Sequence, residues 1–227
     1  MRDTNTNLYD KYAESYDRLI RHTSFYQELL EKVAYSLRGC DKIIDVAGGT
    51  GILAEKLALE GKIVYLVDGS KGMISYARKK LSNETRIHIF EMEAGELKFD
   101  NELFDGVALI NALCFMDNPT KVLKEIYRVL KPGGIFVTSG PKPDMSLEKL
   151  TERCTQSCVE EGVFEQLKDD MRIVAECSRE LVRKEVKNLY YSHHLSEILI
   201  KEILFAEIIA TDDATYANQS HFVVAKK

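Results

Sequence analysis

Apolar residues recur along the chain at two spacings, one typical of helices and one typical of short buried strands. Over residues 8–37 the helical spacing predicts two helices; Ser24 with Gln27 has the pattern of a capping box for the second, and Gly39 ends it. From residue 42 to residue 139, short apolar runs alternate with amphipathic stretches. The predicted strands are 42–46, 63–67, 86–91, 104–110 and 135–139, and the predicted helices are 52–60, 70–81 and 119–130.

This alternation predicts an α/β fold. Parallel strands need a crossover between them, usually a helix, and strands that are almost entirely apolar are covered on both faces. A further helix is predicted at 195–204, followed by strands at 205–211 and 219–226, and the short connection between these two strands makes an antiparallel pair. We therefore expect a doubly wound, mostly parallel, seven-stranded Rossmann-like sheet whose last strand is antiparallel.

Residues 144–185 break the alternation, because they are polar, helical in composition and without a strand pattern. We expect this segment to lie over the ligand-binding edge of the sheet as a helical lid. The chain then reads as one domain, 1–227. Its parts are N-terminal helices (1–40), a cofactor-binding core (41–143), the lid (144–185) and a closing helix with two strands (186–227).

Composition limits which binding partners and which cellular compartment we expect. The net charge is −5, and the basic residues are interleaved with acidic ones, so no nucleic-acid partner is expected. The five cysteines include no CxxC pair and have no histidine placed to complete a metal site. No apolar run reaches the ~18 residues of a membrane span, and the N-terminus lacks a secretory signal. We expect a cytoplasmic protein without a membrane partner, either a monomer or a homodimer.

The candidate chemistry centres on a glycine-rich turn between the first predicted strand of the sheet and the helix that follows it. Gly48, Gly49 and Gly51 follow Asp45, and such a turn lets a ligand approach the backbone N–H groups at a helix N-terminus. Residues 49–54 also satisfy the dinucleotide pattern G-x-G-x-x-A, which is a weak signal alone. At this point a dinucleotide and another nucleoside cofactor both fit.

Two carboxylates distinguish these cofactors. Asp68 ends the next strand, seventeen residues after Gly51, where it can accept hydrogen bonds from ribose hydroxyls. Asp45 ends the first strand, where a carboxylate would repel a pyrophosphate but would suit a ligand that carries an ammonium and a sulfonium group.

With these features the chain resembles class I S-adenosylmethionine-dependent methyltransferases, in the group of ubiquinone/menaquinone C-methyltransferases. The resemblance covers residues 8–140 and, more loosely, 186–227. Ala47 stands where the family usually has a glycine, Glu93 where it has an aspartate, and Lys98 where it has a proline. The motifs that carry the resemblance are 9–17, 45–51, 67–73, 93–99 and 130–134.

The resemblance implies a role for each matching residue. Asp45 and the backbone at Ala47, Gly48, Gly49 and Gly51 would hold the methionine part of S-adenosylmethionine, with Asn111 nearby and Tyr9 and Tyr16 closing over its carboxylate. The ribose and adenine would be held by Asp68, Gly69, Ser70, Met73, Glu93 and Ala94. The product would be S-adenosylhomocysteine, and the acceptor would be a small molecule.

Transfer from an activated methyl donor needs a catalytic base only when the acceptor must lose a proton of high pKa. His193 and His194 are the candidates for such a base, with surface histidines as the alternative interpretation. Two other functions remain open. An NAD-dependent oxidoreductase would show a catalytic Tyr-x-x-x-Lys pair near the fourth or fifth strand, and none is present. A protein that binds the cofactor without transferring methyl groups would keep the same motifs.

Overall fold

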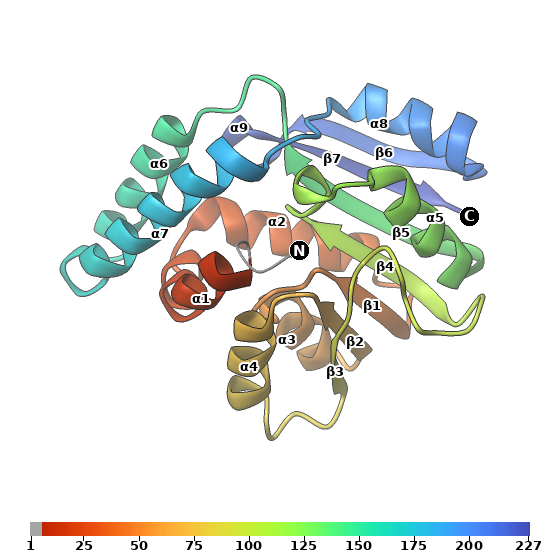
Figure 1. The fold of residues 1–227 in the computed structure, drawn as a ribbon, viewed down its shortest axis with the longest axis horizontal. Coiled ribbons are helices and arrows are strands. Elements are labelled where there is room, and N and C mark those ends of the chain that lie inside the picture. Colours follow the sequence, from red (N-terminus) through yellow and green to blue (C-terminus); the bar gives the residue numbers. More distant parts are fainter. Residues whose placement is uncertain (1–5) are drawn as a thin grey trace.

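A seven-stranded sheet forms the centre of the computed structural model, which describes residues 6–227 and the side chains of residues 12–227 (Figure 1). The strand order is β3-β2-β1-β4-β5-β7-β6, and only β7 runs against the others. The predicted doubly wound, mostly parallel sheet is therefore confirmed. The strands are β1 (Lys42–Val46), β2 (Ile63–Asp68), β3 (Ile87–Glu91), β4 (Phe104–Ile110), β5 (Leu130–Pro141), β6 (Glu207–Ala214) and β7 (Ser220–Lys226).

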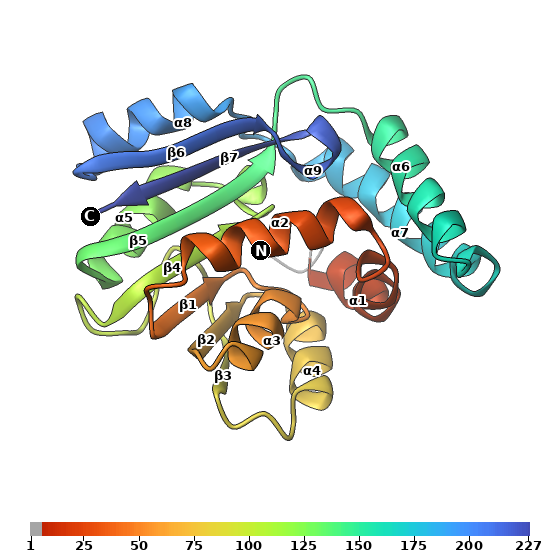
Figure 2. The same ribbon diagram turned by 180° about the vertical axis from the view of Figure 1, so that it is seen from behind.

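Helices cover both faces of this sheet, as the apolar strands require. The helices α2 (Ser24–Ser36), α3 (Ile52–Leu59) and α4 (Lys71–Lys80) pack on one face (Figure 2). The helices α5 (Pro119–Val129) and α8 (Ser192–Ile198), with the π-helical turn Leu199–Ile203, pack on the other. Each face thus has its own buried apolar cluster, with the sheet between them.

The remaining helices lie beyond the carboxyl ends of the parallel strands. The helix α1 (Thr6–Ile20) packs against α4 and α7, and the segment predicted to be a helical lid forms α6 (Leu147–Glu160) and α7 (Phe164–Glu185). A short 3-10 turn, Leu113–Phe115, follows β4, and the turn α9 (Thr215–Asn218) joins β6 to β7. In Figure 1 α9 lies beside α6. These elements surround one end of the sheet.

Two sequence-based details differ in the structure. The residue that caps α2 is Thr23, and its hydroxyl donates to Ile20 O instead of accepting from the helix, so the predicted Ser24–Gln27 capping box is wrong. The α8 helix begins at Ser192, three residues before the predicted start, because the Asp213 carboxylate accepts hydrogen bonds from the backbone N–H and hydroxyl of Ser192. Both contacts involve partners outside the helix itself, which periodicity does not detect.

Candidate active site

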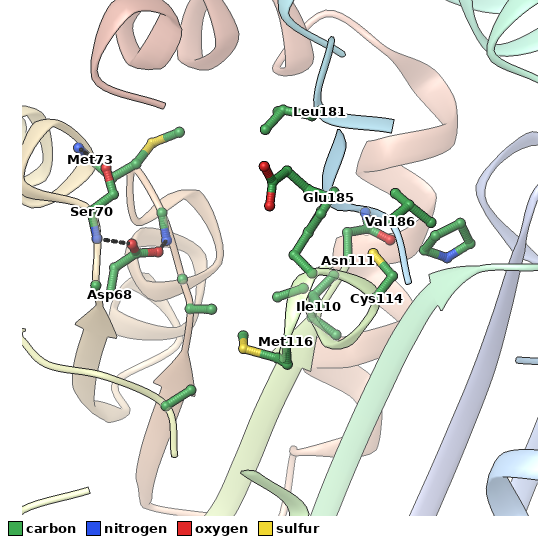
Figure 3. A pocket seen from close by; sticks show the side chains of 18 of the residues that line it. Asp68, Ser70, Met73, Ile110, Asn111, Cys114, Met116, Leu181, Glu185 and Val186 are labelled. Atoms are coloured by element: carbon green, nitrogen blue, oxygen red, sulfur yellow. Dashed lines mark hydrogen bonds between the residues drawn. The ribbon is translucent and has the colours of Figure 1, made fainter. Parts of the chain in front are cut away.

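A cavity of about 810 Å³ opens at the carboxyl ends of β1, β2 and β4 (Figure 3). Its walls come from the glycine-rich turn, from α1 and from the two helices of segment 144–185. The strand order changes direction between β1 and β4, and ligands of doubly wound sheets bind at such a switch point. Its volume lies within the range of about 300–1,000 Å³ typical of small-molecule sites.

The glycine-rich turn brings backbone into contact with this cavity. Ala47, Gly49 and Gly51 all have positive φ, at 55°, 59° and 78°. At Gly48 a Cβ atom would overlap the Leu66 side chain and lie 2.5 Å from Asp45 Oδ2. The absence of a side chain at residue 48 is therefore required by packing, and the left-handed conformation explains the glycines at 49 and 51.

Asp45 lies beneath this turn and is almost entirely withdrawn from solvent, with 1% of its surface exposed. Its Oδ2 atom has no hydrogen-bond partner. Among the buried side-chain nitrogen and oxygen atoms of residues 12–227, only His221 Nε2 also lacks one. Burial, together with the negative charge of Asp68, raises the pKa of Asp45 to about 8. An orphaned buried carboxylate that lines a cavity is suited to binding a cationic ligand group.

Asp68 lies across the same turn, in a different environment. Its Oδ2 accepts from Gly49 N–H at 2.9 Å and its Oδ1 accepts from Ser70 N–H at 2.7 Å (Figure 3). Burial raises the pKa of Asp68, although these two backbone hydrogen bonds oppose the shift. The carboxylate holds the turn in place, and each oxygen keeps a lone pair for a ligand hydroxyl.

The other predicted cofactor residues line the same cavity. The Glu93 carboxylate lies next to Gly69, about 3.5 Å from where a Cβ of that residue would be. Ser70 caps α4 by accepting from Met73 N–H at 3.2 Å. Asn111, across the cavity from Asp68 in Figure 3, has a φ of 54°, a conformation that asparagine tolerates better than most residues. The cavity is also lined by Ala47, Gly48, Gly49, Met73 and Ala94, whereas Gly51 caps α3 behind the turn.

The two tyrosines predicted to close over the cofactor both belong to α1. The Tyr9 side chain falls outside the described part of the structure. Tyr16 lines the cavity, and burial raises its pKa to about 12 against the opposing effect of a hydrogen bond with Tyr26. The Tyr16 ring also meets Tyr12 edge to face, with centroids 5.7 Å apart. The phenol of Tyr16 is therefore neutral and can donate a hydrogen bond to a ligand.

Several lining residues were not predicted from the sequence. Tyr26 of α2 and Tyr216 of α9 reach the cavity, and burial raises the pKa of both phenols well above the usual value. Tyr216 begins three successive residues with positive φ, at 53°, 56° and 63°. The sequence around Tyr26 predicts only a residue that packs within a helix layer. No local pattern at 214–218 predicts the turn that directs Tyr216 into the cavity. Segment 144–185 contributes Met145, Leu147, Leu150, Ser178, Leu181, Val182, Lys184 and Glu185.

The candidate catalytic histidines lie elsewhere. His193 and His194 occupy the first turn of α8, are exposed and have ring centroids 3.9 Å apart. Neither belongs to the lining of the cavity. A catalytic role for this pair is a prediction that its position does not support. Among residues 12–227 there is also no group of three or more His, Cys, Asp or Glu side chains arranged to hold a metal ion.

Comparison with known proteins shows which family the core of the chain is similar to. Residues 44–138 match the family described as a methyltransferase domain. A demethylmenaquinone methyltransferase of Clavibacter sepedonicus is 34% identical over 134 residues, 57% of this chain and 55% of the relative. A ubiquinone/menaquinone biosynthesis C-methyltransferase of Hydrogenovibrio crunogenus is 29% identical over 231 residues, 96% of this chain and 85% of the relative.

Solved structures share the fold. A S-adenosylmethionine-dependent methyltransferase of Thermotoga maritima, described as a possible histamine N-methyltransferase, superposes with a TM-score of 0.66 at 20% identity, covering 97% of this chain and 99% of that one. The chain spans just over half the length of the first relatives that it matches, such as the Clavibacter protein. None of these comparisons supports an NAD-dependent oxidoreductase. The predicted resemblance to methyltransferases is confirmed: residues 44–138 match the methyltransferase domain family, and the fold is that of solved S-adenosylmethionine-dependent methyltransferases.

Proposed function

We propose that the whole chain is a S-adenosylmethionine-dependent methyltransferase that acts on a small-molecule acceptor. The observation that carries this proposal is the buried, unpartnered Oδ2 of Asp45 at the floor of a cavity, directly under a turn that has no room for a side chain at Gly48. The ammonium and sulfonium charges of the cofactor supply the positive partner that this carboxylate lacks.

The residues present fit the rest of the cofactor. The lone pairs that remain on Asp68 would accept hydrogen bonds from the ribose hydroxyls, with Glu93 and the backbone of Ala94 at the adenine edge. Met73 is buried at the wall of the cavity and supplies a polarizable surface for the adenine ring. The phenol of Tyr16 is a neutral donor for the methionine carboxylate, and the Tyr26 phenol hydrogen-bonds to Tyr16.

The chemistry asked of the protein is mainly positioning. When bound, the cofactor supplies a methyl group on a positively charged sulfur, and transfer breaks that carbon–sulfur bond, leaves its electrons on sulfur and forms a bond to an acceptor lone pair. The turn, Asp45 and Asp68 fix the orientation of the donor. Segment 144–185, which forms α6 and α7 over the cavity, would act as a lid that excludes water.

The names of the relatives support a small acceptor. The Clavibacter protein is named a demethylmenaquinone methyltransferase and the Hydrogenovibrio protein a ubiquinone/menaquinone biosynthesis C-methyltransferase, and both names refer to small molecules. We extend this class, but not the particular compound, to this chain. We also propose that the protein is cytoplasmic, is a monomer or a homodimer, and has no nucleic-acid partner. No helix in residues 6–227 is long and apolar enough to cross a membrane.

Methyl transfer to a metabolite extract tests this proposal. The protein is incubated with methyl-labelled S-adenosylmethionine and a small-molecule extract, and the label is followed by chromatography. We expect a labelled small molecule that is absent when Asp45→Asn replaces the wild-type protein. Label confined to protein or nucleic acid would contradict a small acceptor, and binding of the cofactor without transfer to any fraction would favour the non-methylating alternative.

A further inference from the structure

The turn α9, which joins β6 to β7 beside the cavity, has a strained backbone. Tyr216, Ala217 and Asn218 are all left-handed, with φ of 53°, 56° and 63°. A positive φ is rare for a tyrosine, because its Cβ atom crowds the backbone in this conformation. Such strain persists only where the surrounding structure holds it, and it concentrates at ligand sites. The strain of this turn therefore points to a functional side chain within it.

Polar contacts at both ends of the turn hold it in this conformation. Thr215 Oγ1 donates to Ser220 O at 3.0 Å, and the same two residues form an antiparallel bridge. Gln219 Oε1 accepts from the N–H of Ser146, the residue that caps α6, at 2.6 Å. The turn is thereby attached to β7 and to the start of α6.

The ring of Tyr216 is fixed by packing, and its hydroxyl is available to a ligand. The ring meets Phe25 and Tyr26 edge to face, with centroids 4.7 and 6.1 Å apart, and the side chain lines the cavity. Burial, followed by the nearby phenol of Tyr16, raises the pKa of Tyr216 well above its usual value. Among residues 12–227, no group hydrogen-bonds to the Tyr216 hydroxyl. Tyr216 therefore presents a neutral, firmly held O–H donor to the cavity.

Around Asp45 and Tyr16, the described residues supply neutral donors and no cation. No basic side chain contributes to the pKa shifts of Asp45, Tyr16 or Tyr216. A carboxylate bound in this part of the cavity would therefore depend on neutral donors, because a buried anion must be hydrogen-bonded. In residues 12–227, the basic side chains that line the cavity come from α5 and from the end of α7 and the residues after it, and they are Lys121, Lys184 and Lys187.

We propose that Tyr216 is a second hydrogen-bond donor, beside Tyr16, for the carboxylate of the methionine part of the cofactor. This rests on the proposed function, which places the ammonium group of that part at Asp45. The Tyr26 phenol is already hydrogen-bonded to Tyr16, whereas the Tyr216 phenol has no such partner. Tyr216 thus helps to orient the methyl donor, and the strained turn positions it to do so.

A ligand that lacks only the carboxylate isolates this contact. Calorimetry on the full chain compares S-adenosylhomocysteine with its decarboxylated analogue, S-adenosyl-3-thiopropylamine, in the wild-type protein and in Tyr216→Phe. The substitution keeps the ring that packs on Phe25 and Tyr26 and removes only the hydroxyl. We expect Tyr216→Phe to weaken S-adenosylhomocysteine binding about tenfold, as for a lost hydrogen bond to a charged group, and to change binding of the analogue by less than about twofold.

Tyr35→Phe is the matched control, because Tyr35 is an exposed tyrosine of α2 outside this cavity, and it should change neither affinity. Unchanged binding of S-adenosylhomocysteine in Tyr216→Phe would overturn the proposal. An equal loss for both ligands would also overturn it, since a purely structural residue would have that effect.

The wild-type titrations separate this contact from the proposed function. If the wild-type protein bound neither ligand, the proposed function would fail, and the contact with it. If the wild-type protein bound S-adenosylhomocysteine and Tyr216→Phe did not discriminate between the two ligands, only the role of Tyr216 would fail.

Discussion

Asp45 and Asp68 lie at the ends of neighbouring strands, and their different surroundings give them different roles. The Asp68 carboxylate accepts two backbone N–H groups and so fixes the glycine-rich turn, while Asp45 Oδ2 accepts none. The sequence placed both residues in the site, since each ends an apolar strand. It could not show which oxygen would be left unpartnered, because that depends on Gly48 and Leu66 packing around it.

For Asp68, the Asp68→Ala substitution should weaken S-adenosylmethionine binding at least about tenfold, equivalent to roughly 1.4 kcal/mol for a lost charge-assisted contact. The change also releases Gly49 N–H and Ser70 N–H, so the turn loses its anchor. Titration calorimetry measures the effect. Asp100→Ala, at an exposed aspartate outside the cavity, is the control, and equal affinity in the two variants would refute the ribose role.

For Asp45, cofactor affinity should rise between pH 6 and pH 7.5, because the raised pKa leaves this carboxyl mostly protonated in the free protein. A cationic ligand favours the ionised form, so binding in this range should release a proton, and affinity can increase by at most about tenfold per pH unit. Calorimetry in buffers of different ionisation enthalpy counts that proton. Asp45→Asn should bind weakly and without proton release.

The raised pKa of Asp45 also predicts that the stability of the protein falls as pH rises, whereas its cofactor affinity rises. A carboxyl whose pKa is raised by folding destabilises the native state increasingly as pH rises from its unfolded pKa, near 4, to its folded value of about 8. Asp45→Asn should therefore be more stable than the wild-type protein at pH 8, and the difference should shrink at pH 5. Denaturant unfolding at both pH values measures it, and a difference independent of pH would contradict the raised pKa.

At the scale of elements, the buried carboxylate of Asp17 is one of the contacts that hold α1 over the cavity. Asp17 accepts from Arg21 Nε at 2.9 Å and from Lys80 Nζ at 2.7 Å, and Thr50 of the glycine-rich turn also hydrogen-bonds to it. Burial opposes ionisation, but these donors outweigh it and lower the pKa of Asp17. The contact links α1 to α4 and to the turn, and so positions the cavity-lining Tyr16.

Replacing Asp17 by asparagine should lower the free energy of unfolding by roughly 2–3 kcal/mol at neutral pH, through loss of hydrogen bonds to charged groups. Because folding lowers the pKa of Asp17, its contribution is present above the unfolded pKa and is lost as pH falls through the folded value, so the two proteins should converge in acid. Glu165→Gln, in an exposed pair with Lys168, should change stability little. An equal loss of unfolding free energy in both variants would contradict the proposed role of Asp17.

The elements themselves were largely predictable, and their placement over the site was less so. Strands such as 42–46 and 104–110 are mostly apolar, with Asp45 and Asp105 as exceptions, and Gly61 and Pro119 mark helix boundaries, so local pattern suffices. Tyr216 reaches the cavity through three left-handed residues between β6 and β7, a conformation that no sequence rule assigns to Tyr-Ala-Asn. His193 and His194 follow α6 and α7 in sequence, yet α8 turns both outward.

At the scale of the molecule, the sheet brings the carboxyl ends of β1, β2 and β4 to one switch point and leaves segment 144–185 to close the cavity. The family and the fold follow from the core, which sequence motifs describe well. The cavity residues of α6 and α9 are distant in sequence and meet only in the folded chain. That division explains why the core was predictable from the sequence and the cavity walls formed by α6 and α9 were not.

Titration of the purified chain with S-adenosylmethionine tests the central claim most directly. We predict saturable binding at one site per chain, with weaker binding in Asp68→Ala and Asp45→Asn and unchanged binding in Asp100→Ala. An absence of binding at millimolar S-adenosylmethionine, in a sample shown to be folded, would contradict the account.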